Sequence, residues 1–219
     1  VTQNANKECQ YLVRKVLKLN PDARIVIMGC YAQLKPKEIA EIIGVDLVLG
    51  NNEKFKLKKY LTDLHKLEHT KIIHKSVEKL NDFETAFSFG DRTRSFLKIQ
   101  DGCNYNCSFC TIPLARGKSR SDTIANTVMV AREAIDKGAK EIVLTGVNIG
   151  DYGKNSDESF LDLIKRLDNL NIERIRISSI EPNLLTNDII EFCSKSKKFM
   201  PHFHVPVSYT HLRAHETVL

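Results

Sequence analysis

Three cysteines fall within eight residues of the chain, in the stretch Cys103-Asn-Tyr-Asn-Cys107-Ser-Phe-Cys110. Three thiolates at this spacing can wrap one cube-shaped iron–sulfur cluster. A four-iron cube with three protein ligands leaves one iron open, as a cluster that binds a cofactor or substrate requires. The stretch lacks the CxxCxxCxxxCP spacing of bacterial ferredoxins. It therefore predicts a 4Fe–4S cluster with one open coordination position.

A structural zinc site is the alternative for the same cysteines. Structural zinc prefers four Cys or His ligands, and only Thr111, Ile112 and Pro113 follow Cys110. The missing fourth ligand favours iron. A zinc-stabilised module that binds nucleic acid through a basic surface stays open as a second interpretation.

Cys30 is a further candidate ligand because of its place in the sequence. It follows the β-branched run 24–28 and Gly29, and ligands of open α/β sheets gather at the carboxyl ends of strands. Taken alone, a single cysteine is more often a small buried hydrophobic residue. That interpretation is stronger still for Cys9, which lies within the first predicted helix.

Composition indicates a folded protein with a slight basic excess. Of 219 residues, 42% are hydrophobic and 27% charged, and 33 Lys and Arg face 27 Asp and Glu, for a net charge of +6. The charge favours polyanionic partners, although a merely soluble basic surface fits as well. No apolar run approaches the ~20 residues that cross a bilayer, and residues 1–10 are polar. We expect a cytoplasmic protein that makes no contact with a membrane.

The first part of the chain predicts an α-β-α-β pattern, typical of a doubly wound sheet. The expected elements are a helix over 4–19, a strand over 24–28, a helix over 36–43 and a strand over 46–49. From 54 to 90 the pattern weakens and lysines recur without a sustained period. A lysine run is usually a solvated face, and a nucleic-acid role for it is the alternative.

The second part predicts a series of βα units. Strands are expected over 96–100, 141–145, 174–178 and 202–205, with helices over 123–137, 160–167 and 186–194. At ~30 residues per unit this gives about four units, too few for a complete eight-fold barrel. The fold class is therefore α/β, with a partial N-terminal domain (1–65), a connecting segment (66–92) and a truncated (β/α) barrel (93–206).

The cysteine loop resembles the signature of the radical S-adenosylmethionine (SAM) superfamily, with Phe109 as the aromatic residue before the last cysteine. The resemblance implies that Cys103, Cys107 and Cys110 hold a 4Fe–4S cluster whose open iron is chelated by SAM, while Phe109 packs beside the cluster. One electron from the cluster would cleave SAM and give a 5′-deoxyadenosyl radical that abstracts hydrogen from an unreactive C–H bond.

Several other stretches resemble the methylthiotransferases of that superfamily. They are Gly29-Cys30-Tyr31-Ala32-Gln33, Gly44-Val45-Asp46 with Gly50-Asn51, Phe89-Gly90-Asp91-Arg92-Thr93-Arg94, and Ala115-Arg116-Gly117 with Ser119-Arg120. The stretches 144–150 and 178–182 most resemble the branch that acts on threonylcarbamoyladenosine in tRNA. That family carries a second 4Fe–4S cluster in its N-terminal domain. Cys30 matches the last of its three ligands, and the other two would lie before Val1.

The resemblance also implies roles for residues at the ends of later strands. Gly146 and Asn148 match the loop that meets the methionine end of SAM, although a plain glycine turn is as probable from the sequence alone. Ser179 and Glu181 are candidates for contact with the SAM ribose, and a solvated carboxylate is the alternative. Arg116 and Arg120 can neutralise an RNA phosphate or the SAM carboxylate. His202 and His204, on one face of a predicted strand, fit packing or substrate-lining roles better than metal binding.

Residues 207–219 match nothing in the family and resemble a translated cloning adapter, so they carry no functional argument. We expect the chain to be an internal fragment of a longer enzyme, inactive alone, that lacks a C-terminal RNA-binding module. The implied reaction adds a methylthio group to carbon 2 of N6-threonylcarbamoyladenosine beside the tRNA anticodon. Its partners would be tRNA, SAM and a reducing electron donor. A sibling acting on isopentenyladenosine or on a ribosomal-protein aspartate is the nearest alternative.

Overall fold

The structure is a computed structural model, and it describes residues 2–62, 69–80, 82–88, 90, 93–105, 107 and 110–206, except for the side chain of Lys79. The chain divides into two compact units. The N-terminal unit comprises residues 1–82 and 111–117, and the C-terminal unit comprises 83–110 and 118–219. Each unit is described below by itself.

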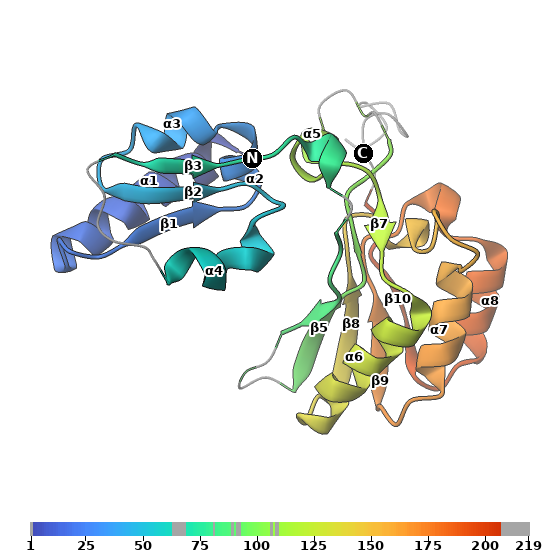
Figure 1. Ribbon diagram of the computed structural model, residues 1–219. Coiled ribbons are helices and arrows are strands. Elements are labelled where there is room, and N and C mark those ends of the chain that lie inside the picture. Colours follow the sequence, from blue (N-terminus) through green and yellow to red (C-terminus); the bar gives the residue numbers. More distant parts are fainter. Residues whose placement is uncertain are drawn as a thin grey trace, which may run out of the picture. The chain divides into compact units, whose positions relative to one another are not determined.

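A parallel three-stranded sheet organises the N-terminal unit, in the order β1-β2-β3 (Figure 1). The strands are β1 (Ile25–Met28), β2 (Val45–Leu49) and β3 (Lys71–Ile73). All five residues of the central strand β2 are buried, as expected for a parallel strand covered on both faces.

Helices cover both faces of this sheet. The helices α1 (Gln3–Leu19), α2 (Cys30–Leu34) and α3 (Pro36–Ala40) form one core with Val45 and Val48 of β2. The short helix α4 (Leu57–Leu61), which follows the 3-10 turn η1 (Lys54–Lys56), packs with Leu47 and Leu49 instead. Figure 1 shows α4 on the opposite side of the sheet from α1.

The helix α5 (Ile112–Arg116) joins the N-terminal unit although it follows the cysteine loop in sequence. It packs against α2 and against the 3-10 turn η2 (Val77–Lys79). Gly117 ends α5 with φ of 73°, a conformation that glycine adopts readily. The chain then returns to the C-terminal unit at Lys118.

The C-terminal unit has a five-stranded sheet in the order β10-β9-β8-β5-β4. The strands β5 (Arg94–Lys98), β8 (Glu141–Thr145), β9 (Arg174–Ile177) and β10 (Phe199–Phe203) are parallel, and β4 (Ala86–Phe87) pairs antiparallel with β5. A small antiparallel ladder joins β6 (Gln100–Asp101) to β7 (Arg120–Ser121).

Three helices, α6 (Ile124–Asp136), α7 (Phe160–Asp168) and α8 (Asn187–Lys195), lie along one face of this sheet (Figure 1). The strands direct a buried apolar row toward them: Leu97, Ile142, Leu144, Ile175 and Ile177. Thr123, Ser159 and Thr186 cap the helices by accepting hydrogen bonds of 3.1 to 3.4 Å from backbone N–H groups. These caps fix where each helix begins.

The structure confirms the predicted α/β class, with some shifts in the elements. The third helix ends at Ala40 rather than at residue 43, and β10 spans 199–203 rather than 202–205. The edge position of β10 tolerates Pro201 within the strand. β3 lies in the segment predicted to connect the domains, yet it pairs with β2. The domain boundaries themselves, including a tail at 207–219 outside the described residues, stay predictions.

Among the described residues, no helix combines the length and the apolar character that crossing a membrane requires.

Candidate functional site

The cysteine loop begins directly after β5 and β6, beyond the carboxyl end of a central strand of the C-terminal sheet. Cys103 is buried, while Cys107 and Cys110 are half-buried. The backbone N–H of Cys110 donates to the carbonyl of Cys107 at 3.0 Å, and the N–H of Tyr105 lies 3.5 Å from the sulfur of Cys103. Phe109, the residue expected to pack beside the cluster, lies outside the described residues.

The Cys103 thiol lies in an environment that disfavours its negative charge. Burial raises the pKa of Cys103, a hydrogen bond from the Tyr105 N–H lowers it, and the charges of Glu181, Asp151 and Cys110 raise it further. A bound metal centre reverses this balance, because a cation stabilises the thiolate. The negative charges of Glu181 and Asp151 thus lie near Cys103, where the iron ions of a cluster would bring positive charge.

The cysteine loop contains the three sulfur donors that a three-thiolate cluster needs. The structure records no disulfide for Cys103, Cys107 or Cys110. Within the described residues, no three Cys, His, Asp or Glu side chains already converge on one metal position. Two buried polar atoms near this loop also have no hydrogen-bond partner in the described part of the chain, the amide nitrogen Nδ2 of Asn148 and Oδ2 of Asp151.

The loop after β8 carries Gly146 and Asn148, the residues predicted to meet the methionine end of SAM. Asn148 is buried, and its Oδ1 accepts a hydrogen bond from the backbone N–H of Glu181 at 3.2 Å. Asp151, in the 3-10 turn η3 (Ile149–Asp151), accepts from Lys154 at 2.9 Å. The Lys154 ammonium lies 4.9 Å from the ring centre of Tyr105, so this loop also contacts the cysteine loop.

The loop after β9 carries Ser179 and Glu181, and it lies beside the loop after β8. The backbone N–H of Ile149 donates to the carbonyl of Ser179 at 3.0 Å. Ser179 has φ of 54°, a left-handed conformation that is uncommon for a residue other than glycine. Such strain is often found at binding sites. The 3-10 turn η4 (Pro182–Leu184) follows.

His202 and His204 were predicted to lie on one face of a strand, but β10 ends before His204. His202 is exposed on β10, whereas His204 follows the end of that strand. The Nδ1 atom of His204 lies 3.3 Å from the backbone nitrogen of Ser179. His204 therefore supports the loop after β9.

Sequence reasoning missed Gln100, the residue that bonds these loops together. Its carboxamide is buried and lies within 3.1 Å of five groups, on Asp101, Gly102, Ser119, Val147 and Asn148. A glutamine at the end of an apolar strand carries no pattern that sets it apart. Only the folded arrangement shows its partners.

Cys30 and Arg116 lie in the N-terminal unit. Cys30 is the first residue of α2, after Gly29 with φ of 107°, and it is half-buried. The same helix carries Gln33, whose Oε1 accepts a hydrogen bond of 2.8 Å from the backbone N–H of Asn51. Arg116 is half-buried at the end of α5.

Arg120 lies in the C-terminal unit, and its side chain is 10% exposed. Its guanidinium is 3.5 Å from a carboxylate oxygen of Asp101 and donates to the carbonyl of Lys118 at 3.1 Å. These contacts give Arg120 a structural role, and its predicted contact with RNA stays a prediction.

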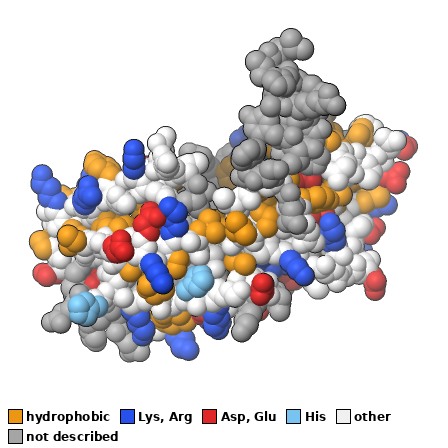
Figure 2. Space-filling view, turned by 90° about the horizontal axis from the view of Figure 1, so that it is seen from above, with side chains coloured by type: hydrophobic (Ala, Val, Ile, Leu, Met, Phe, Trp, Pro, Cys, Tyr) orange, Lys and Arg blue, Asp and Glu red, His pale blue; other side chains and the backbone are white. Residues whose placement is uncertain are grey.

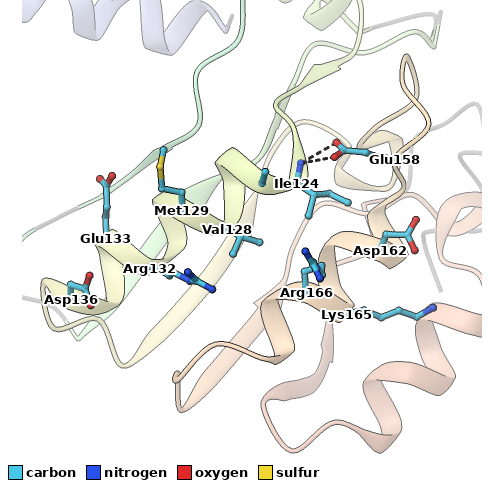
Figure 3. Close-up of a pocket in the computed structure, with 11 residues that line it drawn as sticks. Ile124, Val128, Met129, Arg132, Glu133, Asp136, Glu158, Asp162, Lys165 and Arg166 are labelled. Carbon is cyan, nitrogen blue, oxygen red and sulfur yellow. Dashed lines mark hydrogen bonds between the residues drawn. The ribbon is translucent and has the colours of Figure 1, made fainter.

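A separate groove lies between α6 and α7, with a volume of about 760 Å³ (Figure 3). It is lined by both acidic and basic side chains, among them Arg132, Glu133, Asp162 and Lys165. Figure 3 shows the Glu158 carboxylate bonded to the backbone N–H of Ile124 at the start of α6. None of the predicted site residues that the structure describes lines this groove.

On the face seen in Figure 2, Lys and Arg side chains are scattered among acidic and apolar ones. The basic excess of the sequence therefore forms no single basic patch on this view of the described residues.

Comparison with protein families places the cysteine loop and its neighbouring strands in a known context. The model of the radical SAM superfamily matches residues 97–214, more than half of the chain. The chain belongs to the radical SAM superfamily. Residues 1–50 match a second model, described as uncharacterized protein family UPF0004. Membership implies a 4Fe–4S cluster and SAM as cofactors, as predicted.

Curated relatives of this radical SAM chain are methylthiotransferases by name. It is 40% identical to threonylcarbamoyladenosine tRNA methylthiotransferase MtaB of Bacillus subtilis (strain 168), over 94% of this chain and 47% of that protein. MtaB of Rickettsia prowazekii (strain Madrid E) is 37% identical, over 94% and 49%. Ribosomal protein uS12 methylthiotransferase RimO of Prochlorococcus marinus (strain MIT 9312) is 33% identical, over 91% and 45%. The resemblance to methylthiotransferases is confirmed, and the chain spans about half the length of these relatives.

Proposed function

We propose that this radical SAM chain is part of an enzyme that adds a methylthio group to carbon 2 of N6-threonylcarbamoyladenosine beside the tRNA anticodon. The observation that carries the proposal is the loop with Cys103, Cys107 and Cys110 at the carboxyl end of a parallel strand. The names of the relatives that are 37% to 40% identical supply the substrate class. In this proposal tRNA, SAM and a reducing electron donor are the partners.

The chain's own residues have defined tasks in the proposed reaction. Cys103, Cys107 and Cys110 hold the cluster, and Cys30 is one ligand of the second cluster. Gly146 and Asn148 receive the methionine end of SAM, while Ser179 and Glu181 lie at the ribose. When bound, the cluster and SAM supply the one-electron chemistry that activates a C–H bond.

The buried amide of Asn148 supports this assignment. Its Oδ1 is held by the Glu181 N–H at 3.2 Å, which leaves Nδ2 as a fixed donor with no partner among the described residues. A buried donor without a partner costs about 1–3 kcal/mol. A carboxylate ligand such as that of SAM would remove this cost.

The first test is made on anaerobically purified chain after cluster reconstitution. We expect iron and sulfide in the protein and cleavage of SAM to 5′-deoxyadenosine on reduction, but no methylthio transfer, the activity that the chain alone is expected to lack. Cys103→Ala should abolish both, whereas the matched variant Cys193→Ala should keep them, because Cys193 is buried against the helical core. A colourless protein that holds only zinc would favour the nucleic-acid-binding module instead.

The substrate is tested by mass spectrometry of tRNA nucleosides from cells in which the complete gene is disrupted. We expect loss of the methylthio form of threonylcarbamoyladenosine and its return on complementation. Unchanged levels would reject this substrate. The same cells test the two related methylthiotransferase activities. Loss of methylthio-isopentenyladenosine would assign the chain to the enzymes that act on isopentenyladenosine. Loss of the methylthio group on a ribosomal-protein aspartate would assign it to the enzymes that act on that aspartate.

A further inference from the structure

The side chain of Gln100 joins two loops of the C-terminal unit, although it is 1% exposed and cannot itself reach solvent. Its Nε2 lies 2.7 Å from the carbonyl of Gly102, 3.1 Å from that of Asp101 and 2.9 Å from the hydroxyl of Ser119. Two hydrogens are shared among these three oxygens. Two of these residues, Asp101 and Gly102, lead directly into Cys103.

The other end of the same carboxamide binds the loop after β8. Its Oε1 accepts hydrogen bonds from the backbone N–H groups of Val147 and Asn148, both at 2.9 Å. The chemistry fixes the orientation of the amide, because Oε1 faces two donors and Nε2 faces oxygens. Turning the amide around would break its contacts with the carbonyls of Asp101 and Gly102 and with the N–H groups of Val147 and Asn148.

Close packing keeps the two loops in this arrangement. A Cβ atom at Gly146 would lie 2.9 Å from Oε1 of Gln100, 3.0 Å from its carbonyl oxygen and 2.8 Å from Cγ2 of Ile149. Only a glycine lets the loop after β8 approach Gln100 this closely.

The contact also fixes Asn148 from two sides. Gln100 holds its backbone N–H, and the Glu181 N–H binds its Oδ1. The remaining group, Nδ2, is buried and has no partner in the described part of the chain. Its direction therefore depends on the Gln100 carboxamide.

We propose that Gln100 is a positioning residue for SAM, whose single carboxamide fixes the loop after β8 relative to the start of the cysteine loop. The inference rests on the proposed function. It gives a role in that function to Gln100, a buried residue that acts through the loops it binds. A loop held in its binding conformation loses less entropy when the ligand binds. The affinity for SAM should therefore depend on both ends of this side chain.

Two variants separate the two ends. Gln100→Glu keeps an acceptor for Val147 and Asn148 but places a carboxylate oxygen against the three oxygens that Nε2 now binds. Gln100→Met has a similar length and removes every hydrogen bond. Each should weaken SAM binding by about tenfold or more, since each loses at least two buried hydrogen bonds.

The measurement is the change in the electron paramagnetic resonance signal of the reduced, reconstituted chain as SAM is added. Amide hydrogen exchange gives an independent readout without cofactor: Val147 and Asn148 should exchange faster in Gln100→Met but not in Gln100→Glu. This difference between the variants would show that Oε1 of Gln100 holds the loop after β8.

Gln33→Glu is the matched control. Gln33 is a buried glutamine of the N-terminal unit, and its carboxamide likewise joins separate backbone segments, at Asn51 and Lys75. The Gln33→Glu variant should have a lower melting temperature than wild type, but its affinity for SAM should stay within about twofold of wild type. An equal loss of affinity in Gln33→Glu and Gln100→Glu would overturn the inference.

The outcomes distinguish this inference from the proposed function. If SAM does not perturb the wild-type signal, the proposed function fails and the inference fails with it. If wild type binds SAM and both Gln100 variants bind it equally well, only the inference is overturned. Should neither variant fold, Ser119→Ala decides, since it removes one acceptor and should weaken SAM about threefold. Unchanged affinity in Ser119→Ala would then reject the inference.

Discussion

The side-chain amide of Asn51 donates a hydrogen bond of 2.5 Å to the backbone carbonyl of Ala115. Both residues are buried. The backbone N–H of Asn51 also donates to Gln33 of α2, the helix that begins with Cys30. One asparagine thus connects α2 with α5, the helix that starts two residues after Cys110.

We expect Asn51→Ala to lower the free energy of unfolding by about 1–3 kcal/mol, because it leaves the buried carbonyl of Ala115 without its donor. Urea denaturation measures the change. Asn52→Ala is the matched control, since the side chain of Asn52 makes a single long contact among the described residues, 3.4 Å to Glu53. Equal losses in both variants would contradict the role given to Asn51.

Glu141 is expected to make stability depend on pH. This buried carboxylate accepts hydrogen bonds from Arg94, Arg174 and Arg176 at 2.7 to 3.2 Å. Burial alone would raise the pKa of Glu141, but the three arginines outweigh it and hold the pKa below its ordinary value. A carboxylate with a lowered pKa stabilises the fold above the unfolded-state pKa of about 4.3, and the contribution is lost as pH falls through the folded-state pKa.

Glu141→Gln should therefore cost about 1–3 kcal/mol at pH 7, a range that allows for the partial solvent exposure of the arginines. The difference from wild type should shrink as the pH is lowered below about 4. Urea denaturation across this pH range tests the sign. The exposed pair of Lys140 and Glu173, at 3.3 Å, provides the control Glu173→Gln, which should change stability by less than about 0.5 kcal/mol.

Gly146→Ala should weaken SAM binding and destabilise the C-terminal unit by about 1–3 kcal/mol, because the added methyl group meets Ile149 and Gln100 at less than 3.0 Å. Gly90→Ala is the control, since a Cβ there meets no described atom within 4 Å. Calorimetric titration with SAM and thermal melting measure the two effects. If Gly146→Ala matched wild type in both SAM affinity and melting temperature, the loop after β8 could move away from Gln100 without loss, which would contradict this prediction.

Glu158 is expected to stabilise the start of α6. Both of its carboxylate oxygens lie 3.0 Å from the backbone nitrogen of Ile124, where the helix dipole favours negative charge. Glu158→Gln should cost about 0.5–1 kcal/mol in thermal or urea denaturation, and less at high salt. Glu133→Gln, nearer the carboxyl end of the same helix, should be neutral or slightly stabilising. A loss of the same sign in both variants would argue against the dipole.

The sequence predicted those elements that local chemistry determines. Thr123 and Thr186 cap helices that begin within one residue of the predicted starts, and the apolar strands 141–145 and 174–177 lie where alternation and β-branching indicated. The resemblance of the loop around Cys103, Cys107 and Cys110 to a known signature indicated the superfamily, whose model matches this region. The individual site roles remain predictions.

Partners distant in sequence could not be predicted. Gln100 and Asn148 are 48 residues apart, and Asn51 and Ala115 are 64 apart. A polar residue at a strand end looks the same in sequence whether it faces water or a buried carbonyl. β3 was missed for another reason: three residues are too few to show a period, and the strand is defined by its pairing with β2.

The placement of α5 has a consequence for biosynthesis. The N-terminal unit contains residues 111–117 as well as 1–82, so the unit is complete only after both stretches have been made. On a translating ribosome, that moment arrives after Cys103, Cys107 and Cys110 have been made. The nascent chain therefore cannot complete its first unit before the cysteine loop has been synthesised.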